Sequence, residues 1–250
     1  MIRVRGLRQE YPGGTVALRG VDLDVAAGEF VALIGSSGAG KSTLLRCLNG
    51  LVRSTAGEVE VDGRSVTRAS IHEIRAIRAR IGFVFQQFNL LRRLSVLDNV
   101  LIGRLGHVAV GRSLIGAFPA ADVAKAEAVL ARVELGGLGG RRADTLSGGQ
   151  QQRVAIARAL VQEPRVLLAD EPMASLDPGL SNTVMEILQR INREDGLTVI
   201  TSLHVLEMAR QYAGRVIALS AGRVVYDGAT AALTTEAAAA IFAGGRAHDA

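Results

Sequence analysis

The sequence of 250 residues contains few of the residues that build crosslinked or metal-centred proteins. Its one cysteine, Cys47, excludes a framework of internal disulfides and is expected to be a buried, inert thiol. Of the four histidines, His72, His107 and His248 are expected to be solvated, so we expect no metal cluster. No apolar run approaches the roughly 18 residues of a membrane-spanning helix. We therefore expect a cytosolic chain that reaches a membrane only through a partner.

The chain also lacks a concentrated basic segment. Lysine and arginine number 29 against 24 acidic residues, a net charge of +5, but no run of five or more basic residues occurs. A dedicated nucleic-acid surface is therefore not indicated, whereas nucleotide phosphates or anionic lipid suit this charge. The N-terminal segment Met1–Arg5 has the alternation of a strand rather than the pattern of a signal peptide. The length allows one large domain, or a core with a subdomain.

A glycine-rich loop at residues 35–43 carries the strongest functional signal. The apolar run 30–34 precedes it and a helical pattern follows, which is the strand–turn–helix order of a phosphate-binding loop. Glycines let successive N–H groups point at one anion, and the helix presents its positive end there. Lys41 is expected to reach the β- and γ-phosphates, and the Ser42 hydroxyl to bind Mg²⁺. We expect all nine residues to hold a nucleoside triphosphate: Gly35, Ser36, Ser37, Gly38, Ala39, Gly40, Lys41, Ser42 and Thr43.

The remaining pattern predicts an α/β fold. Alternating residues at 2–5, 21–25 and 58–61 predict an N-terminal antiparallel β region, and apolar runs predict buried strands at 82–85, 165–169 and 197–201. Ile71, Ile74, Ile77 and Ile81 recur at helical spacing and predict an amphipathic helix over 71–80. A helical stretch from about 94 to 133, with Ser95 and Asp122 as N-caps, interrupts the alternation. A hairpin follows at 215–226, and then an alanine-rich tail that we expect to form a short helix.

A second helix N-terminus of phosphate-binding type follows Leu146, in the segment Leu146–Gln150 (the signature segment). Ser147 is a good N-cap, and the glycines leave backbone amides open to an anion. This second cradle lacks a lysine, and one triphosphate does not need two cradles from one subunit. The arrangement is explained if the second cradle serves a nucleotide held by another copy of the chain.

Two carboxylates end the apolar strand that begins at residue 165. Asp170 is expected to hold Mg²⁺, and Glu171 to act as general base toward the attacking water. The alternative role, capping of a helix, is disfavoured because Pro172 follows and because the glycine-rich loop requires a metal ligand.

Three further polar or aromatic residues lie where a ligand could contact them. Gln86 ends the strand 82–85 and suits a ligand crevice, although paired glutamines also cap loops. His204 follows the strand 197–201 and either contacts a γ-phosphate and its water or is an ordinary surface histidine. Tyr11, one of only three tyrosines in a chain without tryptophan, either stacks on a base or packs on the sheet.

The order and spacing of these motifs resemble the ATP-binding subunits of ABC transporters, and Leu-Ser-Gly-Gly-Gln is far more specific than the glycine-rich loop. The resemblance narrows to the phosphonate importer ATPases through the stretches 93–100, 103–106, 142–144, 174–178 and 224–228. Many importers place the histidine directly after a threonine, whereas Ser202-Leu203 intervenes here, as in the phosphonate subgroup.

This resemblance implies a P-loop NTPase core with a mixed or parallel sheet and an inserted helical subdomain. The expected division is a core of 1–87 and 162–233 with the β subdomain, a helical subdomain of 88–161, and a tail of 234–250. Two copies would dimerise head-to-tail around two ATP molecules with Mg²⁺. They would associate with integral-membrane permease subunits at the cytoplasmic face of the inner membrane, and indirectly with a periplasmic or lipid-anchored solute-binding protein.

The resemblance also assigns roles to individual residues. The glycine-rich loop of one copy and the signature segment of the other would clasp each triphosphate through Ser147, Gly148, Gly149 and Gln150. Tyr11 would stack on adenine and His204 would hold the γ-phosphate. Gln86 would sense Mg²⁺ and water and link the site to the permease, while Asp177 would communicate across the dimer.

Other ATPases with these motifs are the alternatives. A chromosome-maintenance or repair ATPase would insert a long coiled coil between the two motifs, and residues 43–146 hold no heptad array. A non-enzymatic regulatory module would be expected to lose Lys41 or Glu171. The ATPase of an amino-acid, methionine or lipoprotein-releasing transporter is the closer rival. The transported solute, whether phosphonate, phosphite or another phosphorus oxyanion, stays open, because the ATPase never touches it.

Overall fold

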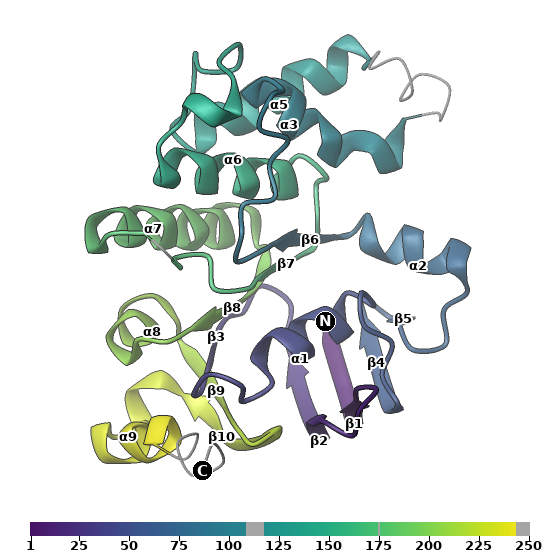
Figure 1. Ribbon diagram of the computed structural model, residues 1–250, viewed down its shortest axis with the longest axis vertical. Coiled ribbons are helices and arrows are strands. Elements are labelled where there is room, and N and C mark those ends of the chain that lie inside the picture. Colours follow the sequence, from purple (N-terminus) through teal and green to yellow (C-terminus); the bar gives the residue numbers. More distant parts are fainter. Residues whose placement is uncertain (109–117, 175, 244–250) are drawn as a thin grey trace.

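The computed structural model describes residues 1–108, 118–174 and 176–243 (Figure 1). Residues 109–117, Ser175 of the stretch 174–178, and residues 244–250 of the expected tail lie outside the described residues. No helix among the described residues is long and apolar enough to cross a membrane.

A six-stranded sheet forms the centre of the fold, with the strand order β10-β9-β3-β8-β7-β6. Five of its strands run parallel, and β10 pairs antiparallel with β9 at one edge. The strands are β3 (Phe30–Ile34), β6 (Ile81–Val84), β7 (Val166–Ala169), β8 (Thr198–Leu203), β9 (Arg215–Ser220) and β10 (Arg223–Ala229). The parallel arrangement brings the carboxyl ends of β3, β6, β7 and β8 to one edge, which is where α/β sheets bind ligands.

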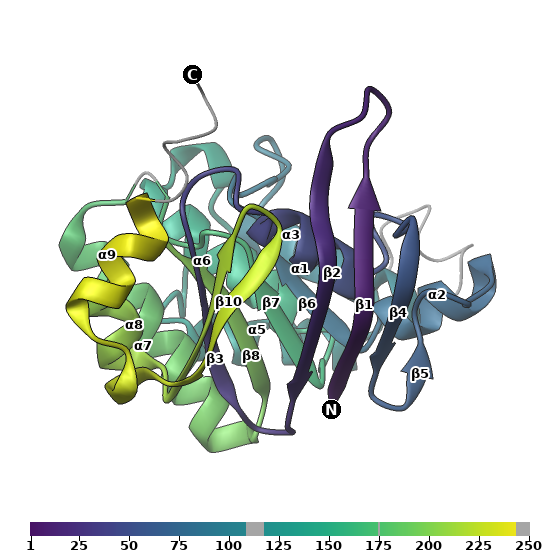
Figure 2. The same cartoon turned by 90° about the horizontal axis from the view of Figure 1, so that it is seen from below.

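A second, antiparallel sheet has the order β2-β1-β4-β5 and lies beside the first (Figure 2). Its strands are β1 (Ile2–Glu10), β2 (Val16–Val25), β4 (Ala56–Val61) and β5 (Arg64–Ser65). This sheet is the expected N-terminal antiparallel region, with strands longer than the alternation alone predicted. Helix α1 (Lys41–Leu48) contributes Leu44, Leu45, Cys47 and Leu48 to the same apolar core as β1, β2 and β4.

The central sheet separates two apolar cores. In β3, Phe30, Ala32 and Ile34 pack into one core, while Val31 and Leu33 pack into the other. The period of two in a strand produces this division, because successive side chains point to opposite faces. The first core is covered by α7 (Pro178–Asp195), α8 (Leu206–Tyr212) and α9 (Thr235–Ala243), with the 3₁₀ turn η3 (Thr230–Ala232) between the last two.

A group of helices is inserted between β6 and β7 and lies at the top of Figure 1. It comprises α3 (Val96–Leu101), the 3₁₀ helix η1 (Ile102–His107), α5 (Ala120–Arg132), the 3₁₀ turn η2 (Ala143–Thr145) and α6 (Gly148–Leu160). The Ser95 side chain caps α3 by accepting from the Asp98 N–H, as predicted. The insertion agrees with the expected helical subdomain, whose boundaries at 88 and 161 stay a prediction.

Two local predictions were wrong. Helix α2 is Ile71–Arg78, and Ile81 belongs to β6; Ile71 is 68% exposed, and Ile77 is the buried residue of this helix. The helical spacing of the isoleucines runs on by coincidence into the next strand. Asp122 is not an N-cap, because α5 begins at Ala120 after Pro119. Asp122 instead lies in the first helical turn, where its carboxylate is buried against an arginine.

Candidate functional site

The glycine-rich loop joins β3 to α1 and has a backbone that only glycine accommodates. Gly35 and Gly40 have φ angles of +148° and +104°, and Gly38 has +75°. A Cβ atom on Gly35 would lie 2.3 Å from the Leu219 carbonyl oxygen, and one on Gly40 2.6 Å from that of Ala17. No side chain caps the N-terminus of α1, so its first backbone N–H groups are left for a ligand.

Lys41 begins α1 and is 4% exposed. Its ammonium donates to the carbonyl oxygens of Gly35 at 2.8 Å and Ser36 at 2.9 Å, so the side chain turns back along the loop. Burial lowers the pKa of the Lys41 ammonium, while the nearby carboxylates Glu171 and Asp170 oppose this shift. A buried cation held by two carbonyl groups, beside the uncapped N-terminus of α1, is suited to a polyanion.

Asp170 lies just beyond β7 and is 1% exposed. Its Oδ1 accepts from the Ser42 hydroxyl at 2.7 Å and from the Ser202 hydroxyl at 3.2 Å. Its Oδ2 is buried with no hydrogen-bond partner among the described residues, and Arg46 Nη2 lies 3.7 Å away. A buried carboxylate oxygen without a partner, beside a serine hydroxyl, fits Mg²⁺, which binds one or two carboxylates together with substrate phosphates.

Glu171 follows in a left-handed backbone conformation, with φ +48°. For a residue other than glycine this conformation is uncommon, and a hydrogen bond from the Glu171 N–H to the Ser202 hydroxyl at 2.8 Å supports it. The turn directs the carboxylate toward the end of the neighbouring strand β8, where Glu171 Oε1 lies 2.5 Å from His204 Nε2.

One hollow of about 320 Å³ brings most of the predicted site residues together. Seven residues of the glycine-rich loop, Ser37–Thr43, line it together with Ala17, Gln86, Glu171 and His204. Gly35 and Ser36 accept hydrogen bonds from Lys41, which lines the hollow. Tyr11 lies at the margin, where its hydroxyl is 3.3 Å from Thr43 Oγ1.

The signature segment does not line this hollow. Ser147 caps α6 in a capping box with Gln150, as the sequence predicted for the N-cap. Ser147 and Gly148 are exposed, while Gly149 packs against α7, where a Cβ atom would lie 2.9 Å from the Leu180 side chain. Asp177 is also exposed and caps α7 by accepting from the Leu180 N–H at 2.9 Å.

Sequence reasoning missed two residues that organise the site. Ser202 is fully buried and joins Asp170 to the backbone of Glu171. Its position at the carboxyl end of a buried strand was the available signal. Arg158 of α6 donates to the carbonyl oxygens of Phe88 at 2.8 Å and Asn89 at 2.6 Å. These bonds connect the segment after Gln86 to α6, the helix that begins in the signature segment. Burial lowers the pKa of the Arg158 guanidinium.

A comparison with protein families decides what kind of protein carries this site. The family model described as ABC transporter matches residues 18–174, which include the glycine-rich loop, the signature segment and the two carboxylates. The chain belongs to the ABC transporter family. The resemblance inferred from the motifs is therefore confirmed.

The curated relatives of this ABC protein match almost its whole length. It is 51% identical to the phosphonates import ATP-binding protein PhnC of Shouchella clausii, over 97% of this chain and 91% of that protein. It is 50% identical to PhnC 2 of Rhodopseudomonas palustris, over 97% of this chain and 89% of the relative.

Solved structures confirm the fold class. The dimeric structure of MJ0796, a bacterial ABC transporter cassette, is 37% identical with a TM-score of 0.82, and covers 92% of this chain and 99% of that one. A post-hydrolysis state of the same cassette bound to ADP and Pi has a TM-score of 0.80 at 36% identity, with the same coverage. The ABC ATPase architecture predicted from the sequence, with its antiparallel region and inserted helices, is thus the observed one.

Proposed function

We propose that this chain is the ATP-hydrolysing subunit of an importer for phosphonates or a related phosphorus oxyanion. The solute class is supported by sequence identity. About half of all residues, over nearly the whole chain, are identical to those of proteins named for phosphonate import. Hydrolysis is supported by the hollow in which the glycine-rich loop faces Glu171 and His204.

The glycine-rich loop, Glu171 and His204 each have a part in this reaction. Lys41 and the loop amides bind the β- and γ-phosphates and orient them for in-line attack. Glu171 accepts a proton from the attacking water, and His204 donates to the γ-phosphate. Tyr11 stacks on the adenine from the margin of the hollow.

Ser42, Asp170 and Gln86 are the residues that would hold Mg²⁺, and the unpartnered Asp170 Oδ2 supports this assignment. The metal neutralises phosphate charge during transfer when it is bound. The Ser202 hydroxyl bonds to both the Asp170 carboxylate and the Glu171 N–H, and so fixes the position of one relative to the other.

Ser147 and Gly148 of the signature segment are exposed, which supports a head-to-tail dimer. Ser147, Gly148, Gly149 and Gln150 of one copy would close over a triphosphate held by the glycine-rich loop of the other. Asp177, exposed at the start of α7, would relay this closure across the dimer. Closing on ATP and opening after hydrolysis would drive integral-membrane permease subunits between two states, with this chain peripheral at the cytoplasmic face of the membrane.

The test is ATPase activity of the reconstituted transporter with its solute receptor. We expect the rate to rise when the receptor is loaded with a phosphonate, and not when it is offered an amino acid, methionine or a lipoprotein. Stimulation by one of these other solutes instead would contradict the proposed solute class, while leaving ATP hydrolysis intact.

A further inference from the structure

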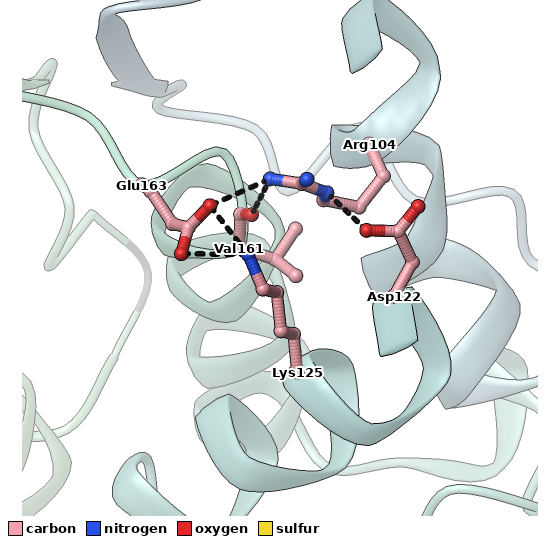
Figure 3. Close-up of polar contacts among 5 residues, drawn as sticks. All are labelled: Arg104, Asp122, Lys125, Val161 and Glu163. Atoms are coloured by element: carbon pink, nitrogen blue, oxygen red, sulfur yellow. Dashed lines mark hydrogen bonds and ion pairs between the residues drawn. The ribbon is translucent and has the colours of Figure 1, made fainter. Parts of the chain in front are cut away.

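The pair Gly103-Arg104, in η1, contacts the C-terminal end of the signature helix α6. The hydrolytic site described above does not use these two residues. Arg104 is 7% exposed, and its guanidinium lies among groups from α5, from the end of α6 and from the turn that follows α6 (Figure 3). The contacts therefore join three separate stretches of the chain at one point.

Arg104 makes three hydrogen bonds to other described residues. Its Nε donates to Asp122 Oδ1 at 2.8 Å, and its Nη1 donates to the Val161 carbonyl at 3.0 Å and to Glu163 Oε2 at 3.1 Å. Val161 is the C-cap residue of α6, and the last carbonyl groups of a helix have no partner within the helix. The buried Asp122 carboxylate, in the first turn of α5, balances the charge of Arg104, which caps α6 from η1.

Gly103 allows η1 to approach α6 closely. A Cβ atom on it would lie 2.2 Å from the Arg158 carbonyl oxygen and 2.6 Å from the Val161 side chain. Any other residue would force η1 away from the last turn of α6, and the guanidinium of Arg104 with it. Gly103 thus permits the close approach of η1 to α6 that Arg104 needs to reach the Val161 carbonyl.

The N-terminus of α6 and its Arg158, in the last turn, both lead to the nucleotide site. The helix has 13 residues and is about 20 Å long at 1.5 Å per residue. Its N-terminus is the signature segment, and its Arg158 holds the carbonyl groups that follow Gln86. Because a helix this short moves as a rigid body, a tilt at its C-terminal end displaces both the signature segment and Arg158.

We propose that Gly103-Arg104 is a positioning element for ATP hydrolysis. It fixes the direction of α6, and so the placement of the signature segment and of the segment 86–89. The inference rests on the proposed function, since it assumes that the signature segment completes an ATP site. Arg104 is a positioning residue here, because it acts through α6 and touches neither the nucleotide nor the water.

The test separates positioning from stability with a double variant, R104M/D122L, in the full chain. Removing both charges together avoids leaving either one buried without a partner, so the variant is expected to fold with a thermal midpoint close to that of the wild type. We expect its kcat for ATP to fall about tenfold, since misplacement by a fraction of an ångström to an ångström costs up to about 100-fold. The Kd of ATP for the isolated chain should stay within about twofold, because the glycine-rich loop lies outside this contact.

Two further variants make the result specific. R104K keeps the charge beside Asp122 but cannot reproduce all three bonds, so its kcat should lie between those of the wild type and the double variant. K125Q removes the exposed lysine that pairs with Glu163 in the same cluster and should keep wild-type kcat (Figure 3).

The outcomes are distinguishable. A folded R104M/D122L variant with wild-type kcat, or one whose rate falls only in proportion to its loss of folded protein, would overturn the positioning role. Equal losses in R104M/D122L and K125Q would overturn it as well. A wild-type chain without any ATPase activity, even in the reconstituted transporter, would instead contradict the proposed function, and with it the inference built on that function.

Discussion

Glu171 Oε1 lies 2.5 Å from His204 Nε2, and this contact joins the carboxyl ends of two adjacent parallel strands, β7 and β8. It places the proposed base and the proposed γ-phosphate ligand at one point of the hollow. The Glu171 backbone is held in a left-handed conformation at the same time, so the carboxylate has a fixed direction.

The substitution E171Q tests the base. The amide keeps the size of the side chain and a polar contact to His204 but cannot accept the proton of the attacking water. We expect kcat to fall by at least about 100-fold, in the range that general-base catalysis supplies. ATP binding should persist, so ATP should drive a dimer that size-exclusion chromatography detects. Hydrolysis at the wild-type rate would refute the assignment of Glu171.

The chain contains two lysines, Lys41 and Lys125, which provide a matched pair of substitutions. K41A removes the cation that the loop encloses, and calorimetry should show ATP affinity reduced by about 100-fold or more, as expected for the loss of a buried phosphate contact worth roughly 3 kcal/mol. K125Q removes an exposed cation from the helical insertion and should leave ATP affinity unchanged. Undiminished affinity in K41A would contradict the phosphate cradle.

Ser202 has an adjacent control in Thr201. Both hydroxyls are buried, but Ser202 bonds to Asp170 and to the Glu171 N–H, whereas Thr201 Oγ1 has no partner among the described residues. S202A should lower the free energy of unfolding by about 1–3 kcal/mol and reduce kcat, because Glu171 loses its backbone support. T201V should be neutral or slightly stabilising in thermal denaturation. A larger loss of stability in T201V than in S202A would count against the role of Ser202.

Burial raises the pKa of the Cys47 thiol to about 12. Because the thiolate is the nucleophile, the native chain at pH 8 should react with an aromatic disulfide reagent far more slowly than the urea-unfolded chain. The raised pKa means that the unfolded chain releases this proton at lower pH than the folded one. Stability should therefore fall as pH rises from about 9 toward 12. Rapid labelling of the folded chain would show that α1 opens, or that the thiol is accessible.

Much of the fold could be predicted because its strands and helices carry strong local signals. The apolar run Phe30–Ile34 coincides with β3, and Ser95 and Ser147 cap the helices expected of them. The failures came where a local pattern competes with tertiary context. Ile81 keeps the helical spacing but pairs with Val166 in the sheet, and helix α8, which has no side-chain N-cap, was not predicted at all.

The site was predictable as a set of residues but not as a network. Motif residues that end parallel strands must meet at one edge of the sheet, and Gln86, Glu171 and His204 do so. The contacts between them depend on strand register and backbone dihedral angles, which periodicity does not encode. Ser202 bridges two residues more than thirty positions away, and the Asp122 carboxylate, expected to cap a helix, is instead bound by Arg104.

The signature segment lies outside the hollow formed by the glycine-rich loop of its own chain. If each catalytic centre draws on two copies, then the rate per molecule depends on how many molecules are paired, and dilution alone should switch the enzyme off. A permease that holds two copies side by side would remove that dependence. Assembly on the membrane would then confine ATP consumption to complete transporters, and unassembled chains would hydrolyse little ATP.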